Sequence, residues 1–141
     1  MENSNVVKTI AQKLFPFIML FGIYLILNGH LSPGGGFQGG VVLGTAIILL
    51  ALSYGIDETE RKFKSKYLSV IEKSGILFFI FLGVLGLFLG NSFLKNFLPL
   101  GREGQILSGG FMLLLNFAIG AKVAAGISTI FYVFFKYRGE I

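Results

Sequence analysis

Four long apolar runs, separated by short polar segments, set the pattern of this 141-residue chain. Each run is long enough to cross a bilayer, whose hydrocarbon core is about 30 Å thick and needs about 20 helical residues. None shows the alternation of a membrane β-strand. Because backbone polar groups in lipid need internal partners, the runs are predicted to be helices. The predicted fold is a single all-α membrane domain over residues 1–141, with four transmembrane helices at 10–28, 36–56, 74–90 and 106–135.

The first run has a second possible interpretation. Its uninterrupted apolar core, Leu14 to Leu27, follows two lysines, as in a secretory signal peptide. No small-residue cleavage site of the A-x-A kind follows it, and three further runs lie downstream. We therefore expect a retained helix, with Pro16 near its start, where a missing N–H matters least.

The basic residues outside the runs predict the orientation of the chain. One side receives Lys8, Lys13, Arg61, Lys62, Lys64, Lys66, Lys73, Lys136 and Arg138, whereas the other receives only Lys95 and Arg102. Short loops rich in Lys and Arg stay in the cytoplasm. Both termini are therefore predicted to be cytoplasmic, in a multi-pass protein of the cell membrane.

Composition excludes several classes of function. The chain has no Cys and one His, which leaves no thiolate site, no disulfide and no multi-histidine metal site. A net charge of +5 does not form the continuous basic face that nucleic acid requires. No nucleophile has an evident base beside it. We expect no enzyme activity from this chain alone, no cofactor, no metal and no nucleic-acid partner.

The connection between the second and third runs, Asp57 to Lys73, places apolar residues at near-helical spacing among its charges. One interpretation is a helix that lies in the membrane interface and leads into the third span. The other is a docking surface for a soluble partner. The sequence leaves both open.

Residues 29–40 read GHLSPGGGFQGG and contain six glycines. Gly34, Gly36 and Gly39 match G-x-G-x-x-G, but the dinucleotide fingerprint requires a preceding strand, and here a membrane helix precedes it. No Lys-Ser or Lys-Thr pair follows, so a phosphate loop of the Walker type is excluded as well. The segment is predicted to be an outer turn, with Ser32 capping the second span.

The glycines of this segment continue into the second run at four-residue spacing. Gly36, Gly40 and Gly44 would share one helix face, with Gly35 and Gly39 one position earlier. Such small faces let another membrane helix approach closely. Because the third and fourth runs carry similar faces, we expect some of them to receive helices of other subunits, and the segment is a candidate docking element.

Two residues are candidates for an ion pathway. Lys122 lies deep in the fourth run, where an ammonium costs at least about 2.5–3.5 kcal/mol to insert. The predicted spans contain no Asp or Glu, so its counter-charge is expected from another subunit, in a pathway or in a structural pair. His30, the one side chain with an unperturbed pKa near neutrality, suits a proton relay, although a lone histidine at a helix end is more often a C-cap or a partner for loop carbonyls. Asn116 and Gln38 are expected to make interhelical hydrogen bonds.

GHLSPGGGFQGG, placed between the first two of four spans, resembles the signature of the B subunit of multisubunit Na⁺/H⁺ antiporters of the Mrp or Mnh type. A related subunit occurs in membrane-bound hydrogenase-like respiratory complexes. The positions that carry the resemblance are Gly29, His30, Pro33, Gly34, Gly35, Gly36, Phe37, Gly39 and Gly40. The resemblance implies a small membrane subunit of an ion-translocating module, with other membrane subunits as partners and Na⁺ and H⁺ as the transported ions.

Three functions fit these observations. The chain shapes or lines a Na⁺ or H⁺ path in an antiporter module, and packs against its neighbours there. Alternatively, it is a purely structural subunit of a hydrogenase-type respiratory complex. A channel formed by copies of this chain alone is the third possibility, which the lack of internal repeats and the few intramembrane polar groups disfavour.

Overall fold

The computed structural model describes residues 4–31, 35–90, 93–94 and 110–138. These residues form helices α1 (Asn5–Leu27), α2 (Gly35–Tyr54), α3 (Ile56–Lys62), α4 (Ser65–Gly90) and α5 (Phe111–Arg138). All but the short α3 are long and apolar enough to cross a membrane. The predicted all-α class with four transmembrane helices is confirmed.

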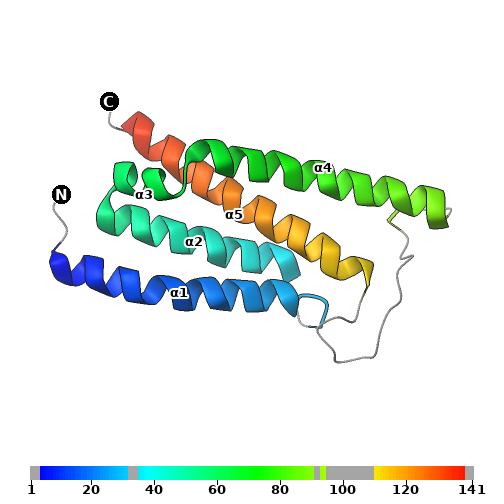
Figure 1. The fold of residues 1–141 in the computed structure, drawn as a ribbon, viewed down its shortest axis with the longest axis horizontal. Helices are drawn as coiled ribbons and strands as arrows, with labels where there is room; N and C mark the ends of the chain where they lie inside the picture. Colours follow the sequence, from blue (N-terminus) through cyan, green and yellow to red (C-terminus); the bar gives the residue numbers. More distant parts are fainter. Residues whose placement is uncertain (1–3, 32–34, 91–92, 95–109, 139–141) are drawn as a thin grey trace.

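The four long helices lie side by side in the order α1, α2, α5, α4 (Figure 1). Helix α5 therefore packs between α2 and α4, although it is the last element of the chain. The start of α1 and the end of α5 lie at the same end of the bundle, next to α3 (Figure 1). Four crossings place both ends on one side of a membrane, and the cytoplasmic assignment of that side stays a prediction.

The helices begin and end at different residues from the predicted spans. Helix α1 begins at Asn5, before residue 10, so that Pro16 lies well inside it. Helix α2 ends at Tyr54 because Gly55 turns the chain with a φ of 94°. Of the predicted span 106–135, residues 106–109 lie outside the described residues, and α5 continues to Arg138.

The largest difference concerns the third span. Helix α4 begins at Ser65, nine residues before the predicted start at residue 74. Charged side chains lower the hydropathy of this stretch, but they do not interrupt helical hydrogen bonds. The connection from Asp57 to Lys73 therefore consists of α3 and the first turns of α4, and the helical part of its first interpretation is confirmed.

The buried core joins α2, α4 and α5. At the end of the bundle near α3, one cluster contains Ile47, Ala51, Leu68, Ala125 and Tyr132. A second cluster near the start of α5 contains Leu82, Phe111 and Leu115. The share of buried residues in the apolar window is 44% for α2 and 39% for α5, but 17% for α1 and α4. The outer helices thus turn most of their surface away from the core.

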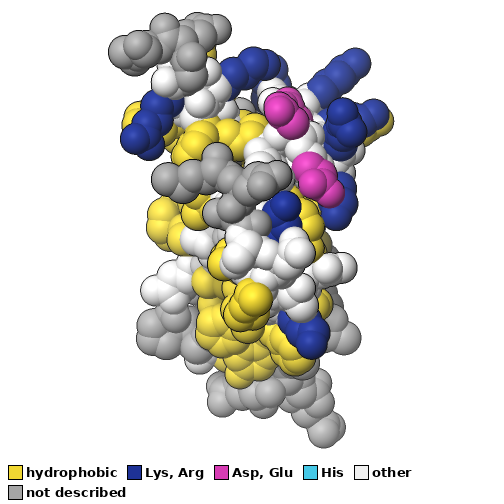
Figure 2. Space-filling model, turned by 90° about the vertical axis from the view of Figure 1, so that its left-hand side faces the viewer, with side chains coloured by type: hydrophobic (Ala, Val, Ile, Leu, Met, Phe, Trp, Pro, Cys, Tyr) yellow, Lys and Arg dark blue, Asp and Glu magenta, His cyan; other side chains and the backbone are white. Residues whose placement is uncertain are grey.

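The exposed surface is apolar over most of its length. Large side chains such as Phe17, Leu77, Phe88 and Phe134 are well over half exposed. Figure 2 views the bundle from the end that carries α3, where Lys and Arg side chains surround the few acidic ones. Charge at one end and apolar sides are the distribution that a bilayer or neighbouring membrane helices require.

Candidate functional site

The glycine face of α2 is covered by α5. A Cβ atom on Gly40 would lie 2.6 Å from the carbonyl oxygen of Gly120, and one on Gly36 would meet the backbone of Asn116. At Gly44 the same construction gives 3.1 Å to Cγ2 of Ile127. The two backbones approach so closely because these positions carry no side chain.

The other small positions of α2 pack on α1. A Cβ atom on Gly39 would lie 2.5 Å from Cγ1 of Ile26 and 2.8 Å from the carbonyl oxygen of Gly22. Gly22 in turn approaches Leu43 of α2. The expectation that these faces receive a helix of another subunit is therefore wrong for Gly36, Gly39, Gly40 and Gly44, since helices of the same chain cover them.

The start of α2 is held by a side chain from α5. The backbone N–H of Gly36 donates to Oδ1 of Asn116 over 3.4 Å. Gly35, just before it, has a φ of 55°, and its α-carbon lies close to Gly29. Asn116 thus makes the interhelical hydrogen bond that we expected of it. The expected cap, Ser32, and the motif residues Pro33 and Gly34 lie outside the described residues.

His30 lies in the turn that follows α1, where it is half-buried. The end of α1 itself is closed by Asn28, whose side-chain Nδ2 donates to the carbonyl oxygen of Tyr24 over 3.0 Å. The turn continues with a bond from the N–H of Leu31 to the carbonyl of Asn28. Phe37, in the first turn of α2, is 61% exposed and points away from the core.

Lys122 is exposed and lies on the side of α5 that faces α4. Its Cβ would be 3.0 Å from a Cβ on Gly75, so Gly75 lets α4 approach at this point. The structure does not bring Lys122 and His30 together. The His30 turn packs near Asn116 through Gly29, and Asn116 and Lys122 are six residues apart, about 120° around the helix.

Glu72 lies one turn before Gly75 on α4, at the same seam as Lys122. Its Oε1 is 3.5 Å from the position of a Cβ on Gly126, which is one turn after Lys122 on α5. The expectation that the counter-charge of Lys122 comes from another subunit stays a prediction, whereas the inference that the spans of this chain contain no Asp or Glu is wrong. It failed because Glu72 precedes the predicted third span, whereas α4 already includes it.

Lys122 of α5 and Glu72 of α4 both lie beside the middle part of α2 and not beyond its ends. Helix α2 itself carries no charged side chain. Gly40, the sixth residue of α2, contacts Val123, the neighbour of Lys122. Gly44, the tenth of its 20 residues, contacts Ile127, the neighbour of Gly126, where the Glu72 carboxylate lies. The seam between α4 and α5 thus holds one cation and one carboxylate at the level of the middle turns of α2.

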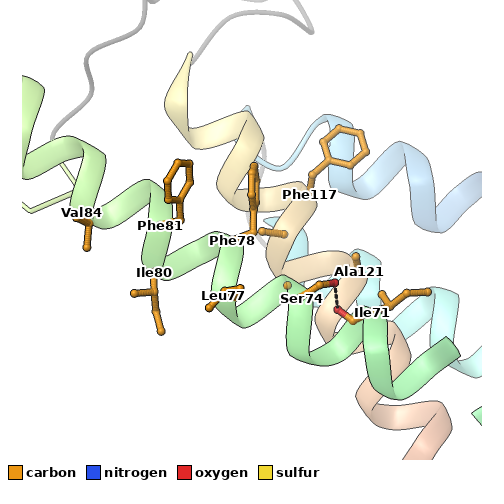
Figure 3. A pocket seen from close by; sticks show the side chains of 11 residues that line it. Ile71, Ser74, Leu77, Phe78, Ile80, Phe81, Val84, Phe117 and Ala121 are labelled. Atoms are coloured by element: carbon orange, nitrogen blue, oxygen red, sulfur yellow. Dashed lines mark hydrogen bonds between the residues drawn. The ribbon is translucent and has the colours of Figure 1, made fainter. Parts of the chain in front are cut away.

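Two hollows flank this seam. A groove of about 880 Å³ lies between α4 and α5, where the rings of Phe78, Phe81 and Phe117 line it (Figure 3). Its polar side chain, Ser74, donates to the carbonyl of Ile71 over 3.0 Å, so the groove offers little polar chemistry. A smaller hollow of about 350 Å³ is lined by Glu72, Gly126 and Thr129, among others. The carboxylate of Glu72 faces this second hollow.

A bundle of four helices that are each long and apolar enough to cross a membrane is the architecture of a multi-pass membrane protein. A family model described as a domain related to the MnhB subunit of the Na⁺/H⁺ antiporter matches residues 6–129. The chain belongs to this family.

Individual relatives agree with this assignment. The chain is 35% identical over 134 residues to an uncharacterised protein of Methanocaldococcus jannaschii, covering 91% of this chain and 51% of that protein. It is 35% identical over 96 residues to the B subunit of the Na(+)/H(+) antiporter of Bacillus subtilis, covering 67% of this chain and 66% of the relative. A putative antiporter subunit mnhB2 of Staphylococcus aureus is 33% identical over 96 residues, covering 68% of this chain and 67% of the relative.

A solved structure has the same fold. A chain in the membrane-bound sulfane sulfur reductase, an archaeal respiratory membrane complex, superposes with a TM-score of 0.79 at 36% identity. The match covers 93% of this chain and 57% of that one. The protein thus spans little more than half the length of that chain and of the archaeal relative.

Proposed function

We propose that this protein is a small membrane subunit of a multisubunit complex that exchanges Na⁺ and H⁺, and that its α4–α5 seam lines part of an ion path. The proposal places it in the cell membrane, beside other membrane subunits. The relatives named as antiporter subunits and the respiratory complex support a place in such an assembly. The observation that carries the pathway role is Lys122.

An exposed ammonium at this depth is unfavourable against lipid, so Lys122 needs either a water-filled cavity or a neighbouring subunit next to it. Helix α5 is 28 residues long, and Lys122 is its twelfth, roughly 16 Å from its start and 24 Å from its end. An ion path supplies both water and neighbouring polar groups. Charged residues inside membrane spans commonly mark such paths.

The test is transport by the purified complex in vesicles, measured as Na⁺-dependent proton exchange. Lys122→Met removes the charge and keeps a flexible chain of similar length, and Lys122→Ala removes both. We expect both variants to assemble and to lose at least tenfold in exchange rate. Lys73→Met is the matched control, because Lys73 is exposed on α4 next to the charged connection. Exchange at the wild-type rate by the fully assembled Lys122→Met complex would exclude the pathway role.

A purely structural subunit is the second candidate, which the extensive exposed apolar surface favours. In that case Lys122→Met would alter assembly on native gels but leave exchange per assembled complex unchanged. His30→Ala distinguishes the two further. A proton relay through His30 predicts slower exchange in this variant, whereas a structural role in the turn after α1 predicts only lower stability.

A further inference from the structure

We propose that Glu72 is the carboxylate that compensates the charge of Lys122, so that the two residues form an intramembrane charge pair within one subunit. This inference rests on the proposed function, because it concerns the same seam. It assigns the counter-charge of Lys122 to α4 of the same chain.

The first support is the position of Glu72 relative to Lys122 along the α4–α5 seam. Gly75 packs directly on Lys122, and Glu72 precedes Gly75 by three residues, which places it on the adjacent turn of the same helix face. Likewise Gly126 follows Lys122 by four residues, and a Cβ atom on Gly126 would lie 3.5 Å from Oε1 of Glu72. The Glu72 carboxylate therefore lies about one helical turn, roughly 5.4 Å, along the seam from the backbone of Lys122.

The second support is the set of other charges near the seam. Helix α2 contributes none over Gly35–Tyr54, and between Phe111 and Phe135 helix α5 contributes only Lys122. On α4, the neighbour Lys73 follows Glu72 directly and is exposed, whereas Glu72 is half-buried. Consecutive helical residues point about 100° apart, so Lys73 faces away from the seam that Glu72 shares with Lys122.

The third support is the space around the carboxylate. The carboxylate of Glu72 faces a hollow beside Gly126 and Thr129. Among the described residues no ion pair joins Lys122 to Glu72, so the proposed pair requires another rotamer of the Lys122 side chain. The four-carbon stem of Lys is long enough to span one turn. Opposite charges attract each other more in a protein or lipid environment than in water, because the lower dielectric constant screens them less.

The experiment is a double-mutant cycle on the assembled complex, read first as thermal stability. Glu72→Gln and Lys122→Met each leave one charge without its partner, so each should lower the melting temperature. The double variant Glu72→Gln/Lys122→Met removes both charges and should recover most of that loss. Additive losses in the double variant would overturn the pair. Recovery in Glu72→Gln/Lys73→Gln instead would assign Glu72 to Lys73 and overturn it too.

A second measurement separates a positioning role from a merely structural one. Glu72→Asp keeps the charge, so we expect it to retain at least half of the exchange rate, whereas Glu72→Gln should lose about tenfold. Equal loss in both variants would contradict the positioning role. Because the cycle is read from stability, its result is independent of transport. Exchange at the wild-type rate by Lys122→Met would contradict the proposed ion path but not the charge pair. Additive losses of stability would contradict the charge pair but not the ion path.

Discussion

The backbone N–H of Gly36 donates to Oδ1 of Asn116 across 3.4 Å, and this bond ties the first turn of α2 to a residue 80 positions later on α5. The N–H groups of a first helical turn have no partner within the helix. Here a side chain of a different helix provides one. The hydrogen bond and the glycine contacts below it make α2 and α5 the central pair of the bundle.

Asn116→Leu should therefore destabilise the protein. The loss should be about 0.5–1.5 kcal/mol, because the bond is long but the donor it leaves is part-buried. Thermal unfolding in detergent measures this. Thr45→Ala is the control, since the Thr45 hydroxyl is exposed and bonds only to Val42 of its own helix. An Asn116→Leu variant as stable as Thr45→Ala would contradict a capping role.

Alanine substitutions along the glycine face should have graded effects. Gly40→Ala brings a methyl group 2.6 Å from a backbone oxygen, which α5 cannot avoid without moving, and should cost about 1–3 kcal/mol. Gly44→Ala meets side-chain atoms at 3.1 Å and should cost less. Gly126→Ala, with its nearest contact at 3.5 Å, is the matched control. Unfolding midpoints measure the order, and a Gly40→Ala variant more stable than Gly126→Ala would be incompatible with this packing.

A disulfide should link α2 to α5. The chain has no cysteine, so Gly44→Cys/Ile127→Cys creates a single possible pair. A Cβ on Gly44 lies 3.2 Å from that of Ile127, close to the separation of about 3.5–4.5 Å in disulfides. Oxidation should produce a faster-migrating band on a denaturing gel. Gly44→Cys/Thr129→Cys should not react, because Thr129 is about 160° away from Ile127 around α5.

Because the chain has no cysteine of its own, its orientation can be tested by introducing single cysteines. The charge asymmetry predicts that α3 is cytoplasmic and that Lys95 lies outside. In intact cells, a membrane-impermeant maleimide should label Lys95→Cys but not Arg61→Cys, which should react only after permeabilisation. The opposite labelling pattern would reverse the predicted topology.

Hydropathy was sufficient to predict the fold class and the four membrane helices, because lipid imposes one backbone solution on any long apolar run. It was not sufficient to place the start of α4. Lys66, Glu72 and Lys73 lower the hydropathy without affecting helix formation. For this reason Glu72 was missed as a neighbour of Lys122. The signal that could have found it is the continuous spacing of Tyr67, Val70 and Ile71 into the apolar run.

The glycine motif shows a second limit of the sequence. Four-residue spacing predicted a bare face on α2, and the structure has that face at Gly36, Gly40 and Gly44. Periodicity identifies a face but not the helix that covers it. The covering helix, α5, lies far along the chain, and its own small residues, such as Gly120, suit partners inside and outside the subunit equally well.

The pairing of α2 with α5 also has a consequence for biosynthesis. The ribosome must add 80 residues after Gly36 before Asn116 exists. At about 5–20 residues per second, this takes roughly 4–16 s. During that interval the bare glycine face of α2 lacks the helix that fills it, so lipid or another membrane helix contacts that face until α5 arrives.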